Sequence, residues 1–165
     1  MVRIETNCVR AFGDRLENRG CTVYGGSLRV KTPSMPPYRY PDLSVVCEAP
    51  QFEEIGGLDV LTNPILIIEV LSTSTEAYDR GDKFTYYKSI TSFREYLLIA
   101  QHRPHVTHYV KQEDGRWSYK ELNEINATVD MQMVHCELPL MDVYRGVEFP
   151  SDAASPYGLT PAETR

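Results

Sequence analysis

The sequence has no long hydrophobic run. None of its apolar stretches could cross a bilayer, no basic segment followed by an apolar one opens the chain, and no internal repeat divides it. The chain has 165 residues, of which 42% are hydrophobic and 24% charged, and this fits one globular domain with a sizeable core. We therefore predict a soluble protein without a targeting segment.

Closely spaced cysteines are also missing. The chain has 4 cysteines that lie far apart, with no CxxC pair among them: Cys8, Cys21, Cys47 and Cys136. This spacing argues against a zinc ribbon and predicts reduced thiols, as found in a cytoplasm.

An excess of positive charge is absent too. The net charge is −6 and the isoelectric point is near 5.2, which disfavours broad non-specific binding to nucleic acid but is compatible with a local basic groove. No GxSxG motif surrounds Ser72, so the sequence does not predict a serine hydrolase.

The segment that organises the chain runs from residue 64 to residue 83. Its apolar run Ile65–Ile68 predicts a central strand covered on both faces. Glu69 follows within the same apolar run, on the strand face that also carries Ile67 and Leu71. Because glutamate is almost never fully buried without a partner, this carboxylate predicts a compensating group and a site near the strand's end.

The remaining patterns predict an α/β fold with a mixed sheet. Helices are expected over residues 4–19 and 76–89, the second with capping-box spacing between Thr73 and Glu76. Strands are expected over 43–47, 95–100, 106–111 and 117–122, with short pieces within 21–30, a weak edge strand over 129–136 and a helical turn over 138–144. We expect residues 51–62 to form an exposed loop and those after Pro150 a flexible tail.

Polar residues flanking these elements each have a structural alternative. Asp42 could open its strand by bonding local backbone, and Asp79 and Lys83 have the spacing of an ordinary helical ion pair. Glu69 could form a buried pair with Lys83 or with an arginine.

Three further groups are weaker candidates. Neighbouring histidines on an extended segment point to opposite faces, which disfavours a zinc site built from His102, His105 and His108. Aromatic side chains on a helix and strand are more often core than base-stacking, and this applies to Phe84, Tyr86, Tyr87 and Tyr96. Three basic residues could contact phosphates, but they more commonly lie on a solvated helix face: Arg80, Lys88 and Arg94.

Three segments together resemble the Uma-two family of restriction endonuclease-like proteins: YPDLSVV, PILIIEVLS and STEAYDRGDKFTYYKSITSFREYLLI. The resemblance runs from about Ile4 to Pro150 and includes the closing LPLMDVYRGVEFP. The family has the PD-(D/E)XK nuclease-like fold. The resemblance implies a mixed central sheet flanked by helices, with additional antiparallel strands in the C-terminal half, a single domain over residues 1–150 and a tail over 151–165.

The resemblance also implies a site. In such nucleases two carboxylates on adjacent strands hold Mg²⁺, which Mn²⁺ can replace, beside a catalytic lysine. Asp42 and Glu69 match the two acids. The position two residues after Glu69, where the common ExK motif has its lysine, is Leu71, and the resemblance implies that Lys83 takes over. Asp79 and Gln101 are candidate supporting residues.

The expected function is hydrolysis of DNA phosphodiester bonds by a magnesium-dependent, cytoplasmic endonuclease. The alternative is an interaction or assembly module that keeps the nuclease fold without hydrolysis. Members of the family usually carry a hairpin with acidic residues before the first helix, whereas this chain begins almost at that helix. A missing hairpin would expose a sheet edge, so we expect a homodimer.

Overall fold

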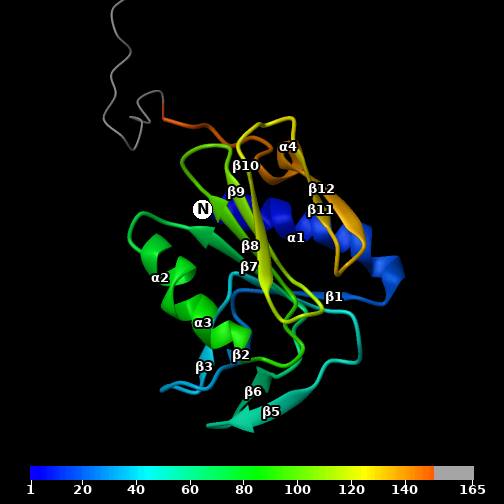
Figure 1. Ribbon diagram of the computed structural model, residues 1–165, viewed down its shortest axis with the longest axis vertical. Helices are drawn as coiled ribbons and strands as arrows, with labels where there is room; N and C mark the ends of the chain where they lie inside the picture. Colours follow the sequence, from blue (N-terminus) through cyan, green and yellow to red (C-terminus); the bar gives the residue numbers. More distant parts are fainter. Residues whose placement is uncertain (151–165) are drawn as a thin grey trace, which may run out of the picture.

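The computed structural model describes residues 1–150, and its centre is a mixed sheet of six strands (Figure 1). Neighbouring strands run antiparallel except for the parallel central pair β7 and β8. In spatial order the strands are β1 (Thr22–Gly25), β4 (Leu43–Val46), β7 (Leu66–Leu71), β8 (Glu95–Ala100), β9 (Val106–Lys111) and β10 (Trp117–Leu122). The predicted α/β fold with a mixed sheet is confirmed.

Helices cover both faces of this sheet (Figure 1). On one face α1 (Val2–Leu16), which a short 3₁₀ turn (Glu17–Arg19) extends, packs on Ile68 and Val70 of β7. On the other face α3 (Asp82–Lys88), preceded by α2 (Glu76–Arg80), packs on Ile67 and Leu71. All six residues of β7 are buried, as the apolar run predicts. No helix within residues 1–150 is long and apolar enough to cross a membrane.

A second sheet replaces the loop expected over residues 51–62. The segment forms the hairpin β5 (Phe52–Ile55) and β6 (Leu58–Leu61), which joins β2 (Arg29–Lys31) and β3 (Tyr38–Arg39) in a four-stranded sheet. Gly56 and Gly57 have φ values of 61° and 77°, and two positive φ values in a two-residue loop are those of a hairpin turn. The polar composition of the segment hid this signal.

The expected edge strand over 129–136 is likewise a separate two-stranded hairpin, formed by β11 (Thr128–Met131) and β12 (Cys136–Pro139). The short helix α4 (Leu140–Val143) follows it, within the predicted helical turn. The tail predicted over residues 151–165 lies outside the described residues.

The helix expected over residues 76–89 is interrupted at Gly81. This glycine adopts φ −103° and ψ −100°, which are not helical, and separates α2 from α3. The predicted capping box is not formed: the N-terminal cap of α2 is Thr75, and Ser72 and Thr75 bond to one another instead.

Two cysteines are joined, contrary to the expectation of reduced thiols. Cys21 and Cys47 flank the paired strands β1 and β4 and form a disulfide, whereas Cys8 and Cys136 are free and buried. Antiparallel pairing sets Thr22 opposite Val46, so the next residues outward also face each other. Sequence spacing could not reveal this contact, and the cysteine argument for a cytoplasmic location loses its basis.

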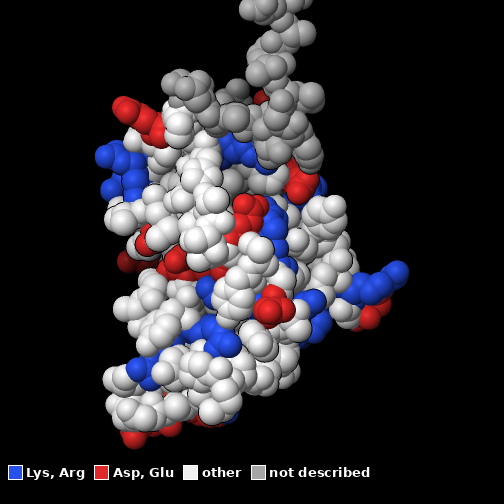
Figure 2. Space-filling view, turned by 90° about the vertical axis from the view of Figure 1, so that its left-hand side faces the viewer, with Lys and Arg blue, Asp and Glu red and all other residues white. Residues whose placement is uncertain are grey.

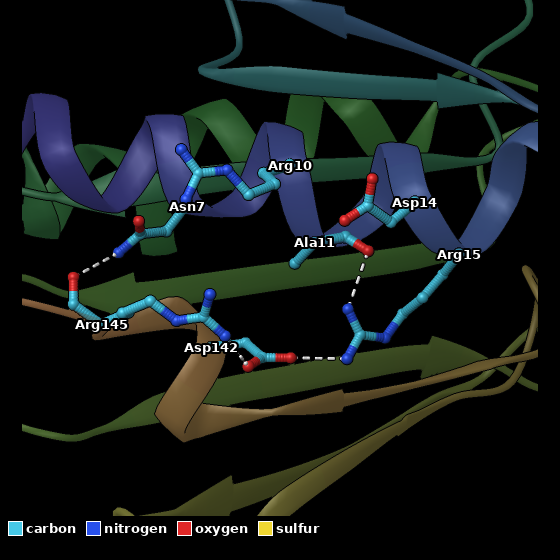
Figure 3. A pocket seen from close by; sticks show the side chains of 7 residues that line it. All are labelled: Asn7, Arg10, Ala11, Asp14, Arg15, Asp142 and Arg145. Carbon is cyan, nitrogen blue, oxygen red and sulfur yellow. Dashed lines mark hydrogen bonds and ion pairs between the residues drawn. The ribbon is translucent and has the colours of Figure 1, made fainter.

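Side chains that line a hollow between α1 and α4 attach α4 to α1 (Figure 3). The buried amide of Asn7 donates to the carbonyl oxygens of Val143 and Arg145 at 2.9 and 3.0 Å. Arg15 pairs with Asp142 at 2.5 Å. Because both carbonyls lie at the end of α4, Asn7 takes the place of missing helical donors there.

We predict that Asn7→Ala lowers the free energy of unfolding by about 1 to 3 kcal/mol, since it leaves one buried and one partly buried carbonyl without their donor. Urea denaturation measures this change. Arg10→Ala is the matched control, because Arg10 is exposed in the same hollow, and it should change stability by less than about 0.5 kcal/mol. Equal effects of the two substitutions would contradict the role of Asn7.

Candidate active site

Strand register brings the two candidate acids together. Leu43 of β4 pairs with Ile68 of β7 in antiparallel fashion, so Asp42 lies beside Glu69 at the same end of the sheet. The backbone N–H of Val70 donates to Asp42 Oδ2 at 2.6 Å, and the N–H of Asp42 donates to Glu69 Oε2 at 3.3 Å. Each acid is therefore held by the other's strand.

Lys83 of α3 reaches this pair from the helical layer. Its Nζ lies 2.7 Å from Glu69 Oε1 and 3.4 Å from Asp79 Oδ1, and it donates to the carbonyl oxygen of Tyr40 at 3.3 Å. Glu69, Asp79 and Lys83 are 2%, 4% and 8% exposed. The helix break does not separate Asp79 from Lys83. The structure thus brings together four of the five residues expected at the site.

Two buried tyrosines donate hydrogen bonds to the cluster. The hydroxyl of Tyr87 donates to Glu69 Oε1 at 2.9 Å, and the hydroxyl of Tyr96 donates to the carbonyl oxygen of Asp79 at 2.9 Å. Both rings are fully buried, which confirms that they belong to the core. Their hydroxyl contacts were missed by sequence reasoning, because a core tyrosine and a site tyrosine have the same pattern.

Burial governs the electrostatics of the cluster. Loss of water raises the pKa of Glu69 to about 8; the Lys83 ammonium opposes this rise and the Asp42 carboxylate adds to it. Burial also raises the pKa of Asp42, against the lowering effects of the Val70 N–H and of Lys83. Burial alone would lower the pKa of Lys83, but Glu69, Asp79 and Asp42 outweigh it, so its pKa is raised. The ammonium therefore stays charged among three carboxyl groups.

Gln101 does not join the cluster. It follows β8, is partly exposed, and makes no hydrogen bond to the site residues within the described part of the chain. Glu5 of α1 is a neighbour that the sequence did not indicate: burial raises its pKa and the nearby charge of Asp42 raises it further. Nothing in the spacing of α1 distinguishes Glu5 from the other charged residues of an amphipathic helix.

The histidines do not form a shared site. His108 Nε2 lies 2.6 Å from Glu95 Oε1, whereas His105 bonds to Asn123 and His102 to Thr73. Across residues 1–150 no group of three or more histidine, cysteine or acidic side chains has the arrangement of a metal site. Each of the three histidines therefore has its own set of partners.

The side of the molecule that carries α2 and α3 has charges of both signs (Figure 2). Acidic side chains gather across the middle of the view, and basic ones gather below them, at the level of β2 and β3. Basic side chains thus gather on this side of the molecule despite the net charge of −6.

The architecture is that of a nuclease-like α/β protein. A solved structure with this fold is described as a putative nuclease belonging to DUF820 from Anabaena variabilis ATCC 29413; it aligns with a TM-score of 0.68 over 87% of this chain and 79% of that one, at 20% identity. Since the identity is low, the likeness establishes the fold alone.

Sequence comparison identifies the family. The Uma2 model, described as "Putative restriction endonuclease", matches residues 2–140, so the chain belongs to the Uma2 family and the resemblance stated from its motifs is confirmed. Two relatives come from Synechocystis sp. (strain ATCC 27184 / PCC 6803 / Kazusa). Uncharacterized protein sll1609 is 35% identical over 80% of this chain and 74% of its own length; uncharacterized protein slr1290 is 29% identical over 84% and 70%. Family membership supports a nuclease.

The raised pKa of Glu69 predicts how stability depends on pH. Between about pH 4.5 and 8 the folded protein holds a proton that the unfolded chain releases, so the Glu69 contribution to stability is present below this window and is lost as pH rises through it. We expect Glu69→Gln to gain stability relative to the wild type as pH rises, by up to about 1.4 kcal/mol per pH unit.

Urea denaturation of both proteins from pH 5 to pH 8.5 measures this difference. Glu48→Gln, at an exposed position, reports the effect of an amide substitution away from the cluster. If the curves for wild type and Glu69→Gln run parallel across the window, the electrostatic description of the cluster is wrong.

Proposed function

We propose that this protein is a magnesium-dependent endonuclease that hydrolyses DNA phosphodiester bonds, with Asp42 and Glu69 as metal ligands and Lys83 as the catalytic cation. The observation that supports this most directly is the 2.7 Å contact between Lys83 Nζ and Glu69 Oε1 at the strand end where Asp42 also lies. Lys83 thereby takes the place of the lysine of the ExK motif, whose position in this chain is Leu71.

The donor set fits a hard cation. Mg²⁺ takes oxygen ligands and usually binds through one or two carboxylates, with water and substrate phosphate completing its shell, so two converging acids are enough. The protein's N–H groups leave part of each carboxylate free: Asp42 uses Oδ2 to accept from Val70, and Glu69 Oε2 accepts only a long 3.3 Å bond. The bound cation would stabilise negative charge on the scissile phosphate and acidify a water.

The chain's own residues have distinct roles in this proposal. Lys83 would stabilise charge on the phosphate or orient the attacking water, and Asp79 holds its ammonium in place. Tyr87 fixes the Glu69 carboxylate by donating to Oε1. Tyr96 acts through the backbone of Asp79 and is a positioning residue.

We expect calorimetric titration with Mn²⁺ or Mg²⁺ to show binding near millimolar or tighter, about −4 kcal/mol or better. Asp42→Ala and Glu69→Ala should abolish it. Because the cation must displace the proton from Glu69, affinity should rise towards tenfold per pH unit between pH 6 and pH 8. A folded wild-type protein that binds neither cation would point instead to a nuclease fold without hydrolysis.

Lys83→Met separates catalysis from metal binding. Removing the ammonium leaves Tyr87 as the partner of Glu69 Oε1 and takes away a positive charge that competes with the cation, so metal affinity should be kept or increased, whereas cleavage of plasmid DNA should fall about 100-fold or more. Lys88→Met is the matched control, since Lys88 is exposed on the same helix and lies over the ring of Phe84. Undiminished cleavage by the Lys83 variant would remove this residue from the mechanism.

A further inference from the structure

Two exposed tyrosines and several partly exposed tyrosines and arginines form a rim beside the candidate active site. Tyr40 and Tyr78 are 47% and 39% exposed, and each lies next to a site carboxylate in the chain: Tyr40 two residues before Asp42, Tyr78 directly before Asp79. The carbonyl oxygen of Tyr40 is itself a partner of Lys83. We call this set the tyrosine–arginine rim, and its members are Arg29, Tyr38, Arg39, Tyr40, Tyr78 and Tyr86.

The arginines of the rim are held by phenols. Arg29 Nε donates to the hydroxyl of Tyr40 at 2.8 Å, and its guanidinium lies 4.4 Å from the ring centre of Tyr38. Arg39 Nε donates to the hydroxyl of Tyr78 at 2.7 Å, and its guanidinium lies 4.9 Å from the ring centre of Tyr86. These contacts position both cations without neutralising them.

Most other arginines with a defined side-chain partner meet a carboxylate. Arg15 and Arg145 pair with Asp142, Arg80 with Glu76, and Arg116 with Asp114. Within residues 1–150 neither rim arginine forms an ion pair, although the chain as a whole carries a net charge of −6. The rim therefore keeps two ordered positive charges beside the site, at the level where basic side chains gather in Figure 2.

Ordered arginines beside exposed aromatic rings suit one class of ligand. Guanidinium groups bind phosphate, and a base stacks on an aromatic ring only when it is not enclosed in a duplex. We propose that the rim binds unpaired nucleotides next to the scissile phosphate, Arg29 and Arg39 contacting the backbone and Tyr40 and Tyr78 stacking on bases. This rests on the proposed nuclease function and makes its substrate a single strand or an unpaired region within a duplex.

Binding is measured without metal, so that cleavage does not interfere. Fluorescence anisotropy in EDTA compares a labelled 20-nucleotide oligo-dT with a 20-base-pair duplex of mixed sequence. We expect the wild-type protein to bind the single strand at least about tenfold more tightly. Tyr40→Leu and Tyr78→Leu should each weaken that binding roughly 5- to 150-fold, the range measured for loss of one stacked base.

Two controls separate the rim from general surface effects. Tyr119→Leu removes a ring on β10 that is more exposed than either rim tyrosine, and Arg116→Gln removes an exposed arginine that has a carboxylate partner; both variants should bind as the wild type does. Arg39→Gln should lower the slope of log affinity against log salt by about 0.7, the value for one phosphate contact on a single strand.

Crosslinking keeps the proposal testable should a leucine variant fail to fold. Irradiation of the wild-type protein with a 5-iodouracil oligonucleotide, followed by peptide mass spectrometry, should place adducts on Tyr40 or Tyr78. Adducts only elsewhere, a preference for the duplex, or unchanged binding by both leucine variants would each overturn the rim. Metal-dependent cleavage that persists in those variants would leave the proposed function standing without it. Conversely, if the protein bound the single strand through the rim but took up no metal, the rim would stand and the proposed nuclease function would fall.

Discussion

A single buried ammonium, that of Lys83, holds the site end of the molecule together. Three carboxyl groups approach one another there, and the ammonium offsets part of the cost of their burial and mutual repulsion, which still leave the pKa of Glu69 raised. Asp79 of α2, Tyr40 directly after β3 and Glu69 of β7 each contribute a partner to Lys83.

The second constraint is the register between β4 and β7. Side chains alternate across a strand, so a shift of one residue would turn Glu69 into the α1 layer and away from Lys83. The bond from the Val70 N–H to Asp42 opposes such a shift, and the disulfide between Cys21 and Cys47 fixes β4 against its other neighbour, β1. The same contacts that hold the sheet also determine the distance between the two acids.

Much of this arrangement could be predicted from sequence. Apolar runs and alternation were sufficient for α1 and for β7 to β10, and the family motifs pointed to Asp42, Glu69 and Lys83. The failures have a common physical origin: they depend on contacts between distant segments. Hairpin β5–β6 is stabilised by pairing with β2, the disulfide joins residues 26 apart, and Tyr87 and Tyr96 look like ordinary core residues until their hydroxyls are located.

The hairpin β5–β6 also bears on how this protein tolerates change. It belongs to the connection between β4 and β7, and that connection leaves the sheet at the end opposite to Asp42 and Glu69. Its tip, Gly56–Gly57, is exposed and has open space around it. Chain length can therefore vary at this tip without altering the spacing of the two acids, which makes it a natural insertion point for an accessory module in evolution and for a reporter in the laboratory.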